Sequence, residues 1–212
     1  MCATTWSHVV LGGVLGLVVA AGAPAADDKK TTEPSDLKVG DAAPTFQLHD
    51  DQDKTWSSSD HVGKKWTVIY FYPGDFTPGC TAQAKAFTAA MDKLAEKGVA
   101  VVGVSGDSVK THELFKQAHK LTFTLLADEE GTVAKQFGVP VGKGATVKAR
   151  DAANKVLEVD GKPYEFERKA TAERWTFVIG PDGKVAYKNT KVVPADDAKK
   201  ITEFIDQAIE KK

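Results

Sequence analysis

Cysteine is nearly absent from this chain, which has only Cys2 and Cys80 among its 212 residues. An excess of one charge is lacking too, because 28 Lys and Arg oppose 29 Asp and Glu for a formal net charge of −1. This balance gives no indication of a basic face for nucleic acid or a polybasic membrane patch. We therefore expect function to come from a local site in one domain with a sizeable core.

Long apolar runs are also lacking, apart from a stretch near the start. Residues 9–23 are apolar and rich in small side chains, but shorter than the roughly 20 residues that span a bilayer. Ala23-Pro24-Ala25 is typical of a cleavage site, so residues 1–25 are predicted to be a secretory signal peptide. No Lys or Arg precedes the apolar run, which leaves an uncleaved anchor as the alternative. Cleavage predicts an exported protein, periplasmic or secreted.

The next segment, 26–37, is polar without periodicity and is predicted to be a flexible lead-in to a folded domain over 38–212. The mature chain would then have one cysteine, Cys80, which excludes an internal disulfide. Such a thiol could be buried and inert, paired with another chain, or reactive.

Runs typical of buried strands alternate with amphipathic helical patterns through most of this domain. Strands are expected at 66–72, 99–104, 123–126, 175–179 and 185–188, and helices at 78–97, 109–119, 132–137 and 198–208. This order predicts an α/β fold with helices on both faces of a sheet.

The segment 142–172 fits the alternation least. Its first part contains Gly142 and Gly144 among charged residues and suggests a loop. Further on, Asp160-Gly161 lies between apolar pairs and suggests the turn of an added β-hairpin over 155–166.

Cys80 lies where a central strand ends and a helix is expected to begin. Thr77 is the expected N-cap and Pro78 the first helical residue. Cys80 then falls in the first turn, where free backbone N–H groups and the helix dipole stabilise an anion such as a thiolate. A small buried apolar residue also suits this position, so position alone leaves the reactive and inert interpretations open.

The string Pro73-x-x-x-Thr77-x-x-Cys80 resembles the active-site signature of the peroxiredoxins. The wider strings Tyr70-Phe71-Tyr72-Pro73 and Thr77-Pro78-Gly79-Cys80-Thr81 are similar to the bacterioferritin-comigratory, or Q-type, AhpC/TSA-like subfamily. The resemblance extends from about Asp41 to the C-terminus. It implies a thioredoxin-like fold, with a central mixed sheet flanked by helices, and a thiol peroxidase acting on hydrogen peroxide and organic hydroperoxides.

The resemblance also implies catalytic roles for four residues. Cys80 would attack the peroxide and become a sulfenic acid. Arg174 would favour the thiolate and bind the peroxide, Thr77 would hydrogen-bond the same oxygens, and Pro73 would shield the thiol. No metal or organic cofactor is implied. Taken singly, Thr77 could be only a helix cap, Pro73 only a strand terminator and Arg174 only a surface charge. Arg168 is the second candidate for the arginine.

Two positions depart from the family pattern. Lys85 stands where Q-type members often carry a resolving cysteine, and Gln83 stands where many relatives carry Glu. The first change implies a one-cysteine cycle, in which an external thioredoxin- or glutaredoxin-like protein or a small thiol reduces the sulfenic acid. The second removes a carboxylate that would hold Arg174, so the orientation of that side chain stays open. A monomer or a homodimer is expected.

Other functions of a thioredoxin-like fold remain as alternatives. Disulfide exchange and copper delivery need a second cysteine where Gln83 or Ala84 stands, so both are disfavoured. A cell-envelope redox or binding protein with a non-catalytic cysteine is the remaining alternative. The histidines show no metal-binding spacing and are expected at the surface: His49, His61, His112 and His119.

Overall fold

The computed structural model describes residues 37–210. The expected signal peptide and residues 26–36 of the expected lead-in lie outside the described residues. Leu37 is 5% exposed, and its carbonyl oxygen accepts a hydrogen bond from Lys188 Nζ at 2.8 Å. Within the described range, no helix has the length and apolar character needed to cross a membrane.

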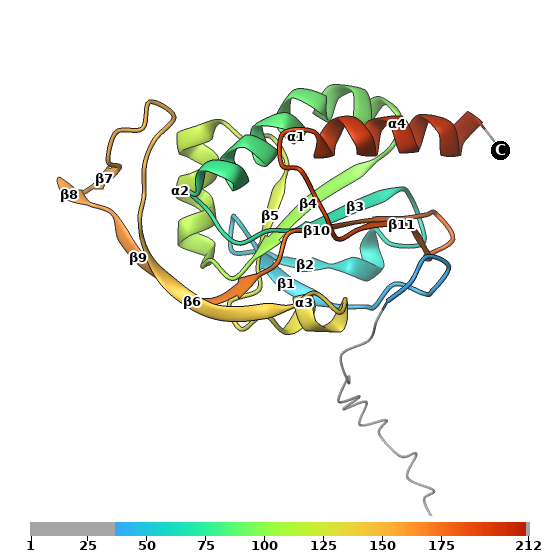
Figure 1. The fold of residues 1–212 in the computed structure, drawn as a ribbon, viewed down its shortest axis with the longest axis horizontal. Helices are drawn as coiled ribbons and strands as arrows, with labels where there is room; N and C mark the ends of the chain where they lie inside the picture. The colour runs from blue at the N-terminus through green and yellow to red at the C-terminus, as the bar shows by residue number, and fades with distance from the viewer. Residues whose placement is uncertain (1–36, 211–212) are drawn as a thin grey trace, which may run out of the picture. The chain divides into compact units, whose positions relative to one another are not determined.

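A seven-stranded mixed sheet forms the centre of the molecule, in the order β11-β10-β3-β4-β5-β1-β2 (Figure 1). The strands β3, β4 and β5 are parallel, whereas β10 pairs antiparallel with both β3 and β11. Every residue of β3 is buried, as expected for a central strand covered on both faces. The strand bounds are β1 (Gln47–Asp50), β2 (Thr55–Ser57), β3 (Thr67–Phe71), β4 (Ala100–Ser105), β5 (Thr124–Ala127), β10 (Trp175–Ile179) and β11 (Val185–Asn189).

Helices cover both faces of this sheet. Apolar residues of α1, α2 and α4 form one core layer, and those of α3 join the layer on the opposite face. Figure 1 shows α1 and α4 running side by side. The helix bounds are η1, a 3₁₀ turn (Ser58–Asp60), α1 (Pro78–Glu96), α2 (Val109–His119), α3 (Thr132–Gln136) and α4 (Asp197–Glu210). The predicted α/β class, with a central mixed sheet flanked by helices, is confirmed.

The sequence interpretation missed one hairpin of the sheet. Strands β1 and β2 pair with each other, and β1 also pairs with β5. They have only four and three residues, and buried or half-buried side chains alternate with more exposed ones along them. Such short edge strands lack the continuous apolar run that identified the central strands.

A second, separate hairpin accounts for the segment 142–172. Strand β6 (Val141–Lys148) pairs antiparallel with β9 (Glu165–Ala172), and β7 (Glu158–Val159) pairs with β8 (Lys162–Pro163) near the tip. The predicted turn at Asp160-Gly161 is confirmed. The predicted loop around Gly142 and Gly144 is wrong, because these residues lie within β6. A Cβ at Gly144 would come within 1.6 Å of the Arg168 carbonyl oxygen, so glycine here permits close strand pairing.

Candidate active site

Cys80 lies at the carboxyl end of β3, in the first turn of α1. Thr77 is the N-cap residue of this helix, with φ −90° and ψ 144°, and Pro78 is its first residue. Cys80 is 1% exposed and is the free cysteine of the described residues. The positive end of the helix dipole therefore faces the sulfur, at a place that favours negative charge.

Arg174 lies beside the sulfur. Its Nη2 donates a hydrogen bond to Cys80 Sγ at 3.1 Å, and its Nη1 donates to Gln83 Oε1. Since β10 begins at the next residue and pairs with β3 through Trp175 and Phe71, the sheet register carries Arg174 to the end where Cys80 lies.

Thr77 and Pro73 belong to the loop that joins β3 to α1. Thr77 Oγ1 donates to the Gly74 carbonyl oxygen at 3.0 Å and makes no side-chain cap bond to the helix. Because a hydroxyl has a single proton, this bond leaves the Thr77 oxygen only as an acceptor for a further ligand. Pro73 is half-buried at the start of the same loop.

Arg168, the second candidate for the arginine, lies behind this loop. Its Nε donates to Asp107 Oδ1 at 2.8 Å, and its Nη2 donates to the Asp75 carbonyl oxygen at 3.4 Å. Arg168 is 5% exposed, and a Cβ at Gly74 would lie 1.8 Å from its guanidinium carbon. The arginine that touches the sulfur is therefore Arg174, while Arg168 supports the loop from the hairpin.

A buried polar network continues from the loop into the core. Asp75 Oδ1 accepts from the Tyr72 hydroxyl at 2.7 Å, and Asp75 Oδ2 lies 2.7 Å from His112 Nδ1. The Asp75 backbone N–H donates to Asp107 Oδ2 at 2.8 Å, and the Ser105 hydroxyl donates to the same oxygen at 2.7 Å. Together these bonds tie the active-site loop to β4 and α2.

The surface prediction for the histidines is wrong for two of them. His112 is 0% exposed. Burial opposes its charge and is the largest single influence, but the Asp75 and Asp107 carboxylates and the Leu126 carbonyl together outweigh burial and raise the pKa of His112. His119 is 8% exposed and packs against Phe76 and Phe115, and its burial lowers its pKa. Sequence spacing missed both, because burial of a polar ring depends on partners far along the chain.

Gln83 connects Arg174 to a carboxyl that the sequence interpretation missed as part of the site. Gln83 Nε2 donates to Asp197 Oδ2 at 2.7 Å, and Thr176 Oγ1 donates to the same oxygen at 2.7 Å. Asp197 is the first residue of α4 and is 0% exposed. Burial raises the pKa of its carboxyl, and the donors from Thr176 and Gln83 oppose that rise. By sequence alone, an acidic residue at a helix start is typical of a charge that complements the helix dipole, so nothing marked Asp197 as part of the site.

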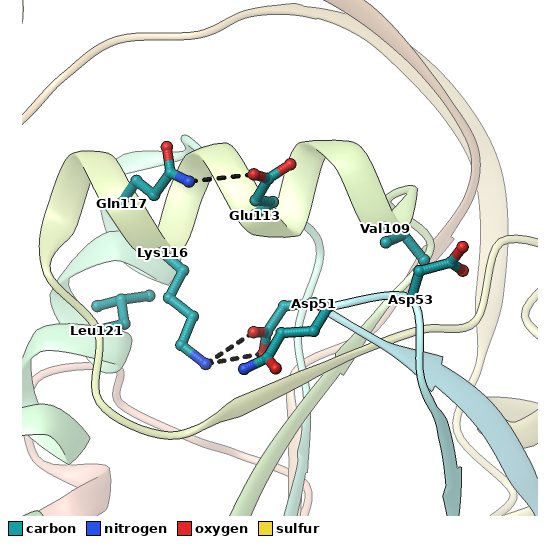
Figure 2. Close-up of a pocket in the computed structure, with 8 residues that line it drawn as sticks. Asp51, Asp53, Val109, Glu113, Lys116, Gln117 and Leu121 are labelled. Atoms are coloured by element: carbon teal, nitrogen blue, oxygen red, sulfur yellow. Dashed lines mark hydrogen bonds and ion pairs between the residues drawn. The ribbon is translucent and has the colours of Figure 1, made fainter.

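A concavity between α2 and the turn after β1 lies apart from these residues (Figure 2). Its polar groups have partners: Lys116 Nζ lies 2.8 and 3.0 Å from the two carboxylate oxygens of Asp51, and Gln117 donates to Glu113 at 3.1 Å. Its carboxylates Asp53 and Glu113 pair with His49 and Lys110 outside the concavity. None of the residues placed around Cys80 lines it. The thiol, rather than this concavity, therefore defines the candidate active site.

Comparisons with known proteins agree with this assignment. Residues 39–188 match the model of the AhpC/TSA family. Over 150 residues the chain is 40% identical to a putative peroxiredoxin bcp of Coxiella burnetii, covering 71% of this chain and 86% of that one. Over 127 residues it is 42% identical to the chloroplastic Peroxiredoxin Q of Populus jackii, covering 60% of this chain and 59% of that one.

Solved structures of peroxiredoxins are also similar to this chain. The peroxidoxin BcpB of Mycobacterium tuberculosis superposes with a TM-score of 0.63 at 28% identity, covering 81% of this chain and 97% of that one. The bacterioferritin comigratory protein of Xanthomonas campestris gives the same four values. The chain belongs to the AhpC/TSA family. Its fold is the thioredoxin-like fold of the peroxiredoxins, and its activity is thiol-dependent reduction of peroxides.

Proposed function

We propose that Cys80 is the nucleophile of this peroxidase and completes its cycle with an external thiol. The observation that carries the proposal is the 3.1 Å contact between Arg174 Nη2 and Cys80 Sγ at a helix start. A cation and a helix N-terminus both stabilise the thiolate, which is the attacking form of cysteine.

In the oxidising step, the Cys80 thiolate attacks the terminal oxygen of a hydroperoxide. An S–O bond forms as the O–O bond breaks, so the sulfur is oxidised to a sulfenic acid and the peroxide is reduced. The departing hydroxide or alkoxide takes a proton from solvent and leaves as water or alcohol. Thiolate and peroxide supply all the electrons, so the step needs no metal or organic cofactor.

The neighbours of Cys80 would stabilise the charge that moves across the O–O bond. The Arg174 guanidinium donates to the sulfur and, from the same group, to the peroxide oxygens. Thr77 Oγ1, whose proton is engaged by Gly74, would accept the O–H of the attacked peroxide oxygen. Pro73 would limit water at the thiol from the start of the loop.

The reducing half of the cycle requires a partner, because no second cysteine occurs in the described part of the chain. Lys85, which replaces the resolving cysteine of related enzymes, is exposed on α1. A first external thiol would displace water from the sulfenic acid and form a mixed disulfide, and a second would release Cys80. A thioredoxin- or glutaredoxin-like protein or a small thiol could serve.

The nucleophile is tested by Cys80→Ser. Wild type should consume hydrogen peroxide and an organic hydroperoxide in the presence of a dithiol, and the variant should not. Dimedone should label Cys80 of peroxide-treated wild type, as read by mass spectrometry. A Cys80→Ser variant as active as wild type would show that the cysteine is not catalytic.

The need for an external thiol is tested by stoichiometry. Without reductant, each chain should consume about one peroxide and stop, because the sulfenic acid has no partner within the chain. Non-reducing mass analysis should then find no disulfide within one chain. Sustained turnover without added thiol would overturn the one-cysteine cycle.

Export with cleavage after Ala25 and a monomeric or homodimeric state complete the proposal. Export is supported by the apolar stretch and small residues at the start of the sequence. Mass analysis of the N-terminus from periplasmic and secreted fractions tests it, and a chain retaining Met1 would contradict cleavage. Sedimentation of the reduced and oxidised protein tests the assembly state.

A further inference from the structure

Gln83 occupies an unusual place, between the guanidinium of Arg174 and the carboxyl of Asp197. We propose that Asp197 is a positioning residue of the active site, which fixes Arg174 toward the thiol by acting through the Gln83 amide. The proposal rests on the function proposed above, because it concerns the arginine that serves Cys80.

The chemistry of the three groups permits one orientation of the amide. Arg174 has only donors, so it requires the amide oxygen of Gln83. The Asp197 Oδ2 atom accepts from Thr176 as well, so it requires the amide nitrogen. A flipped amide would set two donors against each other at Arg174 and two acceptors at Asp197. Asp197 therefore adds a second contact that selects the same orientation of the Gln83 amide as Arg174 does.

The burial of Asp197 makes this link rigid. Asp197 and Gln83 are both 0% exposed, and they join the first turn of α4 to α1. In a region of low dielectric, hydrogen bonds in series polarise one another, so the carboxyl strengthens the acceptor that Arg174 meets. The Nη1 bond to Gln83 then leaves Nη2 directed at Cys80 Sγ.

One of the two oxygens of the Asp197 carboxyl is not stabilised at this place. Asp197 Oδ1 is buried without a hydrogen-bond partner among the described residues. Leaving a buried polar atom unpaired costs free energy, which an apolar side chain of similar size would avoid. A role in orienting Arg174 gives a reason for the carboxyl to be there.

The same geometry explains why position 83 carries an amide. The 2.7 Å contact between Gln83 Nε2 and Asp197 Oδ2 would become a contact between two carboxylates if Glu replaced Gln83. Two carboxylates at that distance cannot both ionise, so they would share a proton. The Gln83 amide and the Asp197 carboxyl therefore form a matched pair. The amide nitrogen of Gln83 donates to Asp197, and this contact directs the amide oxygen toward Arg174.

Substitutions at positions 83 and 197 test the positioning role of Asp197. In Gln83→Glu, kcat/KM for peroxide should fall by roughly tenfold to a hundredfold, which is less than removal of a direct transition-state donor. The loss should deepen as pH rises, because the shared proton is lost and the two anions repel. In the double variant Gln83→Glu, Asp197→Asn, the new Asn amide can donate to the new carboxylate at position 83. There kcat/KM should return to within about threefold of wild type, with the wild-type pH profile.

Asp197→Asn alone keeps a carbonyl acceptor and should lower kcat/KM by only about threefold. Asp128→Asn is the matched control, since Asp128 is also buried and accepts two backbone N–H groups at the start of α3. It should lower stability without changing the pH profile of activity. Additive losses in the double variant, or a Gln83→Glu profile like that of wild type, would overturn the positioning role. An inactive wild type would instead refute the proposed function.

Discussion

At the scale of single residues, the site depends on the fork of Arg174. One terminal nitrogen meets Cys80 Sγ and the other meets Gln83 Oε1, so both ends of the planar group are in use. A guanidinium can hold two such partners at a fixed angle, whereas an ammonium is a point charge on a flexible stem. Geometry as well as charge is therefore needed at this position.

The variant Arg174→Lys separates the contribution of charge from the contribution of geometry. The variant keeps the positive charge near Cys80 but cannot donate to the sulfur and to Gln83 from one rigid plane. We expect kcat/KM for hydrogen peroxide to fall by about 10²–10³, the range found when one preorganised donor is removed. Steady-state rates at saturating reductant measure this, and a Lys variant with the wild-type rate would show that charge alone suffices.

Short sequence patterns place the residues that act locally, whereas Arg174, 94 positions from Cys80, was expected only from the family resemblance. Cys80 and Thr77 are placed by a strand end and a helix start that short patterns reveal. Asp197 reaches Gln83 across 114 positions, and His112 reaches Asp75 across 37. No periodicity marks such pairs, because each partner alone looks like an ordinary polar residue.

At the scale of elements, the β6–β9 hairpin braces the active-site loop. Phe166 of β9 packs against Phe76 of the loop at 6.1 Å between ring centroids. The Tyr164 hydroxyl shares a 3.1 Å hydrogen bond with Thr111 of α2. Together with the contacts of Arg168, these interactions attach the loop and α2 to an element distant in sequence.

Removal of the buried ion pair of this hairpin should weaken the whole fold. Arg168→Met leaves the buried Asp107 carboxylate without its cation, and we expect a loss of about 3–5 kcal/mol of unfolding free energy. Urea denaturation measures the loss. Lys169→Met removes the neighbouring exposed cation that pairs with Glu129 and Glu130, and it should change stability little. Equal losses in the two variants would contradict a special role for the buried pair.

Only part of the β6–β9 hairpin could be predicted from the sequence. The turn at Asp160-Gly161 follows from local chemistry, and Asp160 has a positive φ of 52°. The strand β6 does not follow from local chemistry, because its glycines and lysines have low strand preference. Its structure comes from pairing with β9. Pairing between segments some twenty residues apart is a non-local effect that a short window of sequence does not contain.

At the scale of the whole molecule, stability depends on charge buried at the active-site end of the sheet. Because the pKa of His112 is raised in the fold, the folded state binds its proton more tightly than the unfolded state does. The stability that this tighter proton binding contributes is present in full below the unfolded pKa of about 6.5. It is lost as pH rises through the raised pKa of His112 in the fold. The protein should therefore lose stability as pH rises above about 6.5.

His112→Asn tests that dependence. Asn can still donate to Asp75 but carries no charge, so the difference in unfolding free energy between wild type and variant should be larger near pH ~6 than near pH ~9. Urea denaturation at the two pH values measures it. His49→Asn, at an exposed histidine, is the control and should alter stability little at either pH. A difference independent of pH would refute the charged pair.

The contact between Gly74 and Arg168 has a consequence for how sequences of this kind vary together. Gly74 has a φ of +151°, and any Cβ there would collide with the guanidinium at 1.8 Å. A side chain at this loop position and an arginine at the hairpin position therefore exclude each other. Across many homologous sequences, the arginine should therefore occur only together with glycine at the loop position, whereas glycine can persist without the arginine because its φ alone disfavours a side chain.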